Sequence, residues 1–147
     1  MGRQENVEIF EDTQRLYSSS ERLISAIKHS IAEQQCFEGN ASYWYGPENR
    51  IYQKPARIVL SPKRTLEAAA PYAYAGKKVC VLNFASATNP GGGVIKGSSA
   101  QEEAISRCST LYPNLKAERA WEKFYAPHRR AHEPLHNDDC IYTPGVV

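Results

Sequence analysis

A glycine triplet and a Gln-Glu-Glu triplet are the residues of this chain whose types and spacing could do chemistry. The glycines occupy positions 91–93, and seven residues separate them from positions 101–103. Glycine has no Cβ, so its backbone can adopt positive φ and bring N–H donors close to phosphate or sugar oxygens. A carboxylic acid beside a glycosidic oxygen can protonate the leaving group as that bond breaks. The pattern indicates a ligand-binding loop followed by an acid.

The two adjacent glutamates, Glu102 and Glu103, cannot do the same job from the same place. Neighbouring residues on a helix point ~100° apart, because the helix has about 3.6 residues per turn. One carboxylate could therefore orient sugar hydroxyls while the other handles a proton. A simpler interpretation stays open, because the helix dipole favours acidic residues in a first turn without any function. Glu102 could serve only as the carboxylate of a capping box that begins at Ser99.

The elements on either side of the glycines should position them. Residues 78–84 contain the apolar run Val-Cys-Val-Leu, which is typical of a strand covered on both faces in a parallel sheet. A loop is expected over 85–98, and a capped helix is expected from Ser99. Ligands of open α/β sheets bind beyond the carboxyl ends of strands, where this loop would lie. The buried face of the helix is expected to comprise Ala104, Ile105, Cys108 and Leu111.

The order of the other elements favours an α/β layered fold, because helices come first and strands then alternate with helices. The other predicted elements are a helix over 4–16, a helix that begins at the capping-box stretch 18–21 and runs to about Gln35, extended chain over 41–60, a helix from Ser61 that Pro71 kinks or ends, a charged helix near 115–125 and a strand that starts at Cys140.

Composition excludes several classes of function. The 18 Lys and Arg residues exceed the 16 Asp and Glu residues by two, which is too little for bulk electrostatic binding of nucleic acid. The four cysteines form no CxxC pair, so a zinc site is not expected. His128, His132 and His136 are interpreted as part of a solvated loop rather than a metal site, because Pro134 interrupts any helix there. His128-Arg129-Arg130 is interpreted as a basic surface cluster.

Nothing in the chain predicts a signal peptide or a membrane span. Free thiols fit a reducing, intracellular setting, so we expect a cytoplasmic protein, or a nuclear one if the source is eukaryotic.

The motif and its flanks resemble the microbial-type poly(ADP-ribose) glycohydrolases. That family's signature is three glycines, a spacer of six to eight residues and Gln-Glu-Glu. Gly91, Gly92 and Gly93 followed by Gln101, Glu102 and Glu103 match it. Residues 82–90 (LNFASATNP), 106–112 (SRCSTLY) and 141–147 (IYTPGVV) are also similar to this branch.

The resemblance implies a macrodomain-like, three-layer α/β/α fold. Residues 1–55 would form an N-terminal accessory region, and residues 56–147 would form the first half of the catalytic domain. It implies hydrolysis of ribose–ribose O-glycosidic bonds in poly(ADP-ribose), with release of ADP-ribose and no metal or other cofactor. Glu103 would be the general acid and later the base, and Glu102 and Asn89 would bind the ribose. The Gly91–Gly93 backbone would form the floor of the site, and Gln101 would support the loop.

The length of the chain departs from the family pattern. Family members continue for about as much chain again, with further strands and a second glycine-rich loop that clasps the diphosphate. The fold is therefore expected to be incomplete, with an open sheet edge and weak or absent ADP-ribose binding by the 147 residues alone. Two alternatives to a glycohydrolase stay open: a non-catalytic ADP-ribose-binding macrodomain and a truncated, inactive fragment. The expected partners are poly(ADP-ribose), ADP-ribose and poly(ADP-ribosyl)ated proteins, with no membrane and no direct nucleic-acid binding.

Overall fold

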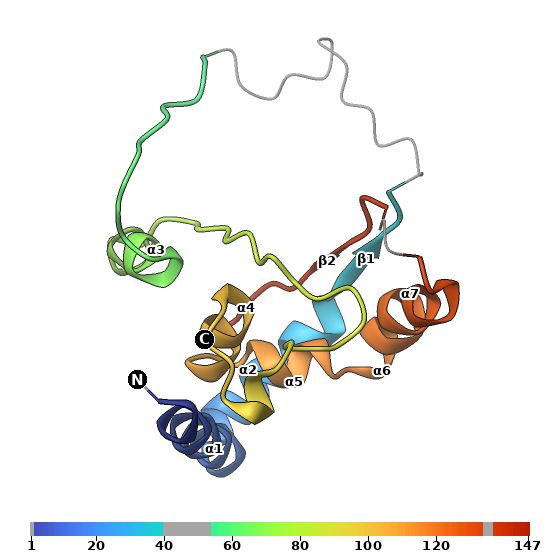
Figure 1. The fold of residues 1–147 in the computed structure, drawn as a ribbon. Coiled ribbons are helices and arrows are strands. Elements are labelled where there is room, and N and C mark those ends of the chain that lie inside the picture. The colour runs from blue at the N-terminus through green and yellow to red at the C-terminus, as the bar shows by residue number, and fades with distance from the viewer. Residues whose placement is uncertain (1, 40–53, 134–136) are drawn as a thin grey trace. The chain divides into compact units, whose positions relative to one another are not determined.

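The computed structural model describes residues 2–39, 54–133 and 137–147. The chain divides into two compact units. The first unit combines Met1–Asn40 with Asn83–Val147, and the second spans Ala41–Leu82. In Figure 1 the first unit holds the blue N-terminal helices and the yellow-to-red elements, and the second holds the green ones. The glycine triplet and both glutamates belong to the first unit, so this unit carries the candidate site.

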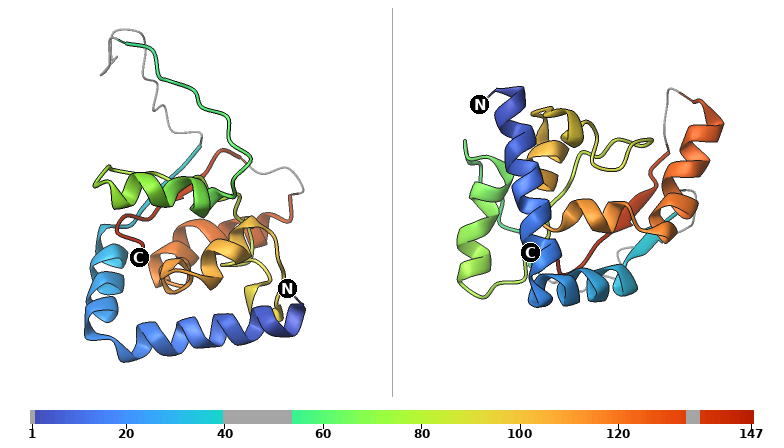
Figure 2. Two further views of the ribbon diagram at one scale, coloured as in Figure 1. Left: turned by 90° about the vertical axis from the view of Figure 1, so that its left-hand side faces the viewer. Right: turned by 90° about the horizontal axis from the view of Figure 1, so that it is seen from below.

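Two helices open the chain, as the sequence predicted. α1 spans Arg3–Ser19 and α2 spans Glu21–Glu33, and Figure 2 shows that the two meet at a steep angle. Ser20 separates them and caps α2, because its side chain accepts a hydrogen bond from the Leu23 N–H at 3.5 Å. The capping hydroxyl is therefore Ser20 rather than the Ser18 of the predicted capping box.

α1 packs against the elements that carry the site. The Phe10 ring lies edge-on to the Tyr112 ring, with centroids 5.0 Å apart. The buried Asn6 amide donates to the Gly97 carbonyl at 3.0 Å, and the Thr13 hydroxyl donates to the Arg107 carbonyl at 2.7 Å. Both hydrogen bonds join residues more than 90 positions apart in the sequence. The N-terminal helix is thus part of the same packed unit as the site, and the predicted boundary at residue 55 stays a prediction.

The sheet of the described residues has two strands, and it is antiparallel. β1 spans Gln35–Phe37 and β2 spans Cys140–Tyr142, with Cys36 paired to Ile141. The predicted strand at Cys140 is confirmed. Its partner lies near the N-terminus rather than in a parallel strand, so the parallel sheet expected from the apolar run is not seen among the described residues.

Short helical elements fill the second half of the first unit. They are the 3₁₀-helix η2 (Val94–Lys96), α4 (Gln101–Arg107), α5 (Leu111–Leu115), α6 (Glu118–Ala120), the π-helix η3 (Trp121–Tyr125) and α7 (Ala126–Ala131). The last three follow one another without a break, so the helix predicted near 115–125 starts later and ends later than expected.

Two interpretations of single residues in this half were wrong. His128 does not lie in a solvated loop: it is buried in α7, with its Nδ1 2.7 Å from the Phe124 carbonyl and its Nε2 3.4 Å from Asp139 Oδ2. Cys108 is not part of the buried face, because it lies at the exposed C-terminal end of α4. His136 lies outside the described residues.

Buried amides and hydroxyls hold much of the first unit together. The Gln34 amide, which has no exposed surface, donates to the Asn114 carbonyl at 3.0 Å and to the Thr143 hydroxyl at 3.2 Å. Asn114 in turn donates to the Thr110 carbonyl at 2.7 Å. The end of the chain is held by the same region, because the Thr110 N–H donates to the Val147 carbonyl at 2.8 Å. Directional bonds of this kind fix α2, α5 and the final segment in one arrangement.

The second unit contains one helix among its described residues, α3, which spans Thr65–Tyr74. It begins four residues after the predicted start at Ser61, and it continues through Pro71 for three more residues. None of its side chains is buried, so the predicted inward positions of Leu66, Ala69 and Ala70 are not confirmed. Most of the predicted extended stretch 41–60 lies outside the described residues, and residues 55–60 have no regular secondary structure.

The strand predicted over residues 78–84 was wrong. These residues have no regular secondary structure, and Leu82 and Phe84 expose 70% and 73% of their surface. A strand is stabilised by hydrogen bonds to a neighbouring strand and by cover on its apolar face. No strand among the described residues pairs with this run. Across the same described ranges, no helix combines the length and apolar character that crossing a membrane requires.

Candidate active site

The glycine triplet forms a tight turn between residues 83–90 and η2. Gly91 and Gly92 have φ values of 71° and 58°, which are left-handed conformations that favour glycine. The Gly92 N–H donates to the Asn89 carbonyl at 2.9 Å, and the Val94 N–H donates to the Gly91 carbonyl at 3.2 Å. In Figure 1 the yellow-green chain makes this turn and then leads into α4. The turn is therefore closed by its own backbone, which leaves its other N–H groups available to side chains.

Glu102 uses both of its carboxylate oxygens to hold this loop. Its Oε2 accepts the Ser86 N–H at 2.7 Å, and its Oε1 accepts the Gly91 N–H at 3.1 Å. The side chain is only 4% exposed. The first residue of α4 is preceded by Ala100, which offers no side-chain cap. The interpretation of Glu102 as only a capping-box carboxylate was therefore wrong, because its bonds reach back 11 and 16 residues along the chain.

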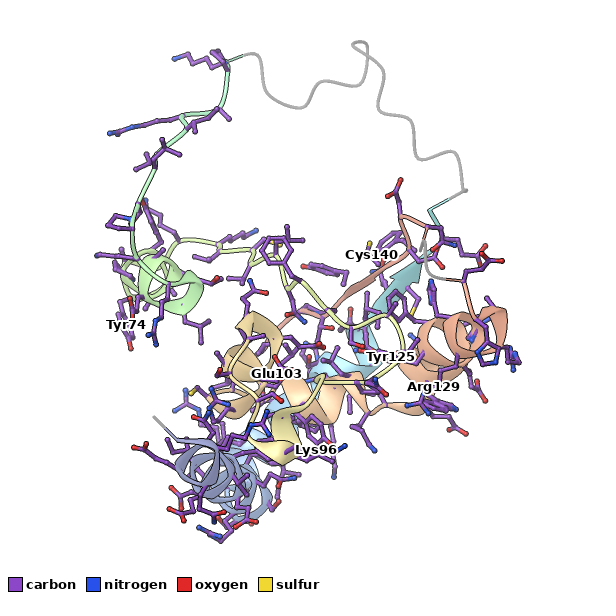
Figure 3. All side chains as sticks on the ribbon, in the orientation of Figure 1. Tyr74, Lys96, Glu103, Tyr125, Arg129 and Cys140 are labelled. Atoms are coloured by element: carbon purple, nitrogen blue, oxygen red, sulfur yellow. The ribbon has the colours of Figure 1, made fainter. Side chains whose placement is uncertain are left out.

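Glu103 lies against the same turn and is held differently. Its Oε1 accepts the Gly93 N–H at 2.9 Å, and its exposed fraction is 8%. Within the described part of the chain, the structure gives no hydrogen-bond donor to its second oxygen, Oε2. Figure 3 labels this side chain, which extends from α4 toward the glycine turn. The two glutamates thus lie together at the glycine turn, one with both oxygens engaged and the other with one.

The missing Cβ atoms of the triplet make this approach possible. A Cβ built on Gly92 would lie 2.5 Å from Glu103 Oε1 and 3.1 Å from Glu102 Oε2. A Cβ on Gly91 would lie 2.6 Å from the Tyr112 ring. Contacts this short cannot be accommodated without movement of the carboxylates or the loop. The triplet therefore serves to bring backbone close to both acids.

Gln101 supports the strip of chain that leads into the loop. Its Oε1 accepts the Phe84 N–H at 2.7 Å. Together with the Glu102 bond to Ser86, this gives two contacts between α4 and residues 84–86. The structure thus brings Gln101, both glutamates and the triplet into one cluster, and their roles in catalysis stay predictions.

The buried position of Glu102 shapes its ionisation. Burial raises the pKa of Glu102 above its ordinary value, and the nearby charge of Glu103 adds to this effect. Hydrogen bonds from the backbone of Ser86 and Gly91 and from the Asn83 side chain oppose it. The fully buried Tyr125 is close enough that the Glu102 charge also raises the Tyr125 pKa, after the larger effect of burial. The loop donors are thus what offset the cost of an ionised carboxylate here.

We expect the raised Glu102 pKa to give a specific pH dependence of stability. The folded state binds this proton more tightly than the unfolded state, whose ordinary value is 4.5. The favourable contribution is therefore fully present below pH 4.5 and is lost as the pH rises through the higher folded value. The melting temperature of the wild type minus that of Glu102→Gln should fall as the pH rises across this window. The exposed Glu118→Gln variant is the control, and a difference that rises with pH would contradict the expectation.

Asn89 lies at the start of the turn, with its side chain engaged by a residue that the sequence did not single out as functional. The Arg129 guanidinium donates to Asn89 Oδ1 and to the Thr88 carbonyl, each at 2.7 Å. The sequence interpretation of Arg129 as a surface charge missed this contact. Ser86 and Asn83 were missed as well, because no local spacing links them to Glu102. Among the residues the structure covers, no three His, Cys, Asp or Glu side chains gather closely enough to hold a metal.

Comparison with known proteins decides the family. The family model described as "Microbial-type PARG, catalytic domain" matches residues 4–147. The chain belongs to the microbial-type PARG family. A search of curated proteins found no match.

Two solved structures of a poly(ADP-ribose) glycohydrolase (PARG) from Thermomonospora curvata are similar to this PARG-family chain. One structure is 30% identical, with a TM-score of 0.78, and the match covers 97% of this chain and 56% of that one. The other, bound to the inhibitor ADP-HPD, is 31% identical, with a TM-score of 0.80 and coverage of 97% and 54%. The PARG-family chain therefore spans a little more than half the length of these relatives.

Proposed function

We propose that the protein carrying this chain hydrolyses ribose–ribose O-glycosidic bonds in poly(ADP-ribose) and releases ADP-ribose. Glu103 is the general acid and base in this proposal. The observation that carries it is the unequal use of the two buried carboxylates at the glycine turn. Glu102 accepts backbone hydrogen bonds on both oxygens, whereas from the described residues Glu103 accepts one, on Oε1. Family membership and the likeness to Thermomonospora curvata PARG support the same reaction.

The proton chemistry follows from this inequality. Both oxygens of Glu102 already hold the loop through backbone N–H groups, so the exchange of a proton between Glu102 and a substrate would disturb the loop. A proton on Glu103 Oε2 would disturb no hydrogen bond of the described residues. Glu103 can therefore hold a proton on Oε2, give it to the glycosidic oxygen as the bond to the anomeric carbon breaks, and become a carboxylate. That carboxylate then takes a proton from the water that attacks the oxocarbenium-like centre, which restores the acid.

Glu102, Asn89 and the glycine backbone bind the sugar in this proposal. A carboxylate oxygen has two lone pairs, so Glu102 can accept a ribose hydroxyl on each oxygen in addition to its backbone donor. The loop is then held and the sugar oriented by the same group. Gly91–Gly93 bring the backbone close to ribose and diphosphate oxygens, and Gln101 fixes residues 84–86 behind them. The solved relative bound to ADP-HPD supports a ligand of the ADP-ribose class.

We also propose the fold that this reaction requires. In a protein of the relatives' full length, this chain contributes to a three-layer α/β/α macrodomain-like fold. The large apolar side chains that it exposes support this, since Ile58, Leu60 and Leu82 expose 86%, 94% and 70% of their surface. Residues 1–55 are the accessory region, although α1 packs on the site elements. The proposed partners are poly(ADP-ribosyl)ated proteins. The proposed location is the cytoplasm.

The proposal is tested by restoring the length of the relatives. Residues 4–147 replace the matching segment of Thermomonospora curvata PARG, and the chimera is incubated with poly(ADP-ribose). We expect ADP-ribose release, measured by chromatography with mass detection, and at most weak release from the 147-residue chain alone. Circular dichroism and thermal melting establish that the chimera is folded. A folded chimera that binds ADP-ribose without cleaving polymer would instead support a binding module.

A further inference from the structure

Arg129 makes a three-way contact at the edge of the candidate site. From α7 it donates two hydrogen bonds of 2.7 Å to consecutive residues of the glycine loop. Nε donates to the Thr88 carbonyl, and Nη2 donates to the Asn89 side-chain oxygen. Its guanidinium carbon also lies 4.9 Å from the centre of the Trp121 ring. Figure 3 labels Arg129 on α7, and its two hydrogen bonds join this helix to the loop.

The contacts restrict the direction in which the guanidinium points. The group lies over the Trp121 ring, and its fork of donors engages two oxygens of the loop. Trp121 begins η3 and Arg129 lies in α7, so one continuous helical stretch, from Glu118 to Ala131, supplies both partners. Arg129 and Asn89 are both exposed, and three contacts of the arginine are made together at this surface. The Arg129 side chain therefore attaches the loop to this helical stretch.

The chemistry of the two side chains determines how Asn89 faces a ligand. An arginine has only donors, whereas an asparagine amide has one acceptor oxygen and one NH₂ group. Because the amide oxygen faces Arg129, the NH₂ group must face the other way. We propose that Arg129 is a positioning residue, which orients Asn89 so that its amide offers N–H donors, and not its carbonyl, to a ribose oxygen. The ribose part of this inference rests on the proposed function.

The orientation is tested first without ligand, on the 147-residue chain. The Asn89 side-chain NH₂ resonances are identified by their loss in Asn89→Ala. In the wild type we expect two well-separated, rigid resonances. In Arg129→Ala they should shift and show the fast motion of a free side chain, and Arg129→Lys should rescue them only in part, because lysine lacks the fork. Arg130→Ala is the matched control, since Arg130 is the exposed neighbour on the same helix. Unchanged Asn89 resonances in Arg129→Ala would overturn the inference.

The consequence for the ligand is tested in the active chimera. Arg129→Ala and Asn89→Ala should each raise KM by about tenfold, which corresponds to the loss of one well-placed hydrogen bond, with a much smaller change in kcat. The double variant should be no worse than Asn89→Ala, because Arg129 acts only through that residue. Additive effects on KM would overturn the positioning role. An inactive but folded parent chimera would refute the proposed function, and the resonance experiment would still decide whether Arg129 fixes Asn89.

Discussion

Glu103→Gln is expected to stop ADP-ribose release while leaving ADP-ribose binding nearly intact. The glutamine keeps an oxygen that can accept the Gly93 N–H, as Glu103 Oε1 does at 2.9 Å, so the loop should keep its shape. It cannot supply a proton, and general acid–base catalysis typically contributes about 10²–10⁴-fold in rate. We therefore expect kcat in the chimera to fall by about that factor. Single-turnover release of ADP-ribose and calorimetric titration measure the two quantities separately.

The matched control for this variant is Glu122→Gln, which makes the same chemical change at an exposed position of η3. It should release ADP-ribose at the parental rate. Normal turnover by Glu103→Gln would refute the assignment of the acid. A loss of binding equal to the loss of rate would indicate that Glu103 holds the loop rather than the proton.

Gly92→Ala is expected to lower stability and to abolish binding and turnover together. At a φ of 58° a side chain costs about 1–2 kcal/mol in backbone strain. The added Cβ would also lie 2.5 Å from Glu103 Oε1, so the carboxylate or the turn must move. The Glu103 bond to Gly93 and the Glu102 bond to Gly91 lie on either side of this residue. Denaturant unfolding of the chain measures the first effect, and ADP-ribose release by the chimera measures the second.

Gly145→Ala separates strain from crowding. Gly145 belongs to the same unit and has a φ of 68°, and a Cβ there would meet nothing within 4 Å. The Gly145→Ala variant should lose only the stability that backbone strain costs, and the chimera that carries it should release ADP-ribose at the parental rate. Any additional loss of stability in Gly92→Ala then measures the steric cost of the contact between the added Cβ and the two carboxylates. Equal losses in the two variants, with activity retained in both, would show that the contact is unimportant.

Elements with local signals were predictable from the sequence, and those that depend on distant partners were not. α1 and α2 follow from apolar spacing and a serine cap, which are properties of neighbouring residues. The run at 78–84 has an equally clear apolar signal, yet it forms no strand, because pairing and cover must come from elsewhere in space. β2 was predicted, but its antiparallel partnership with β1 joins residues about a hundred positions apart.

Some features of the candidate site were likewise predictable from the sequence, and others were not. The spacing of the glycines and the Gln-Glu-Glu triplet pointed to one cluster, and the structure brings these residues together. The unequal hydrogen bonding of Glu102 and Glu103 could not be predicted, because it depends on how the chain from Ser86 to Gly93 folds back over α4. The contacts of Arg129 with Thr88 and Asn89 could not be predicted for a related reason, since these partners lie about 40 positions earlier in the sequence. His128 was interpreted as solvated because Pro134 was expected to end any helix, although the structure buries it in α7.

The hydrogen bonds of α1 to Gly97 and Arg107 have a consequence for biosynthesis. The first helix is complete after 19 residues, but the carbonyl that receives the Thr13 hydroxyl lies 94 positions further along. Translation adds about 5–20 residues per second, so roughly 5–20 s pass between the synthesis of α1 and the synthesis of the segment that accepts this hydrogen bond. During that interval Phe10 has no ring to pack against. Nascent chains of this protein should therefore keep Phe10 without its aromatic partner until Tyr112 has left the exit tunnel.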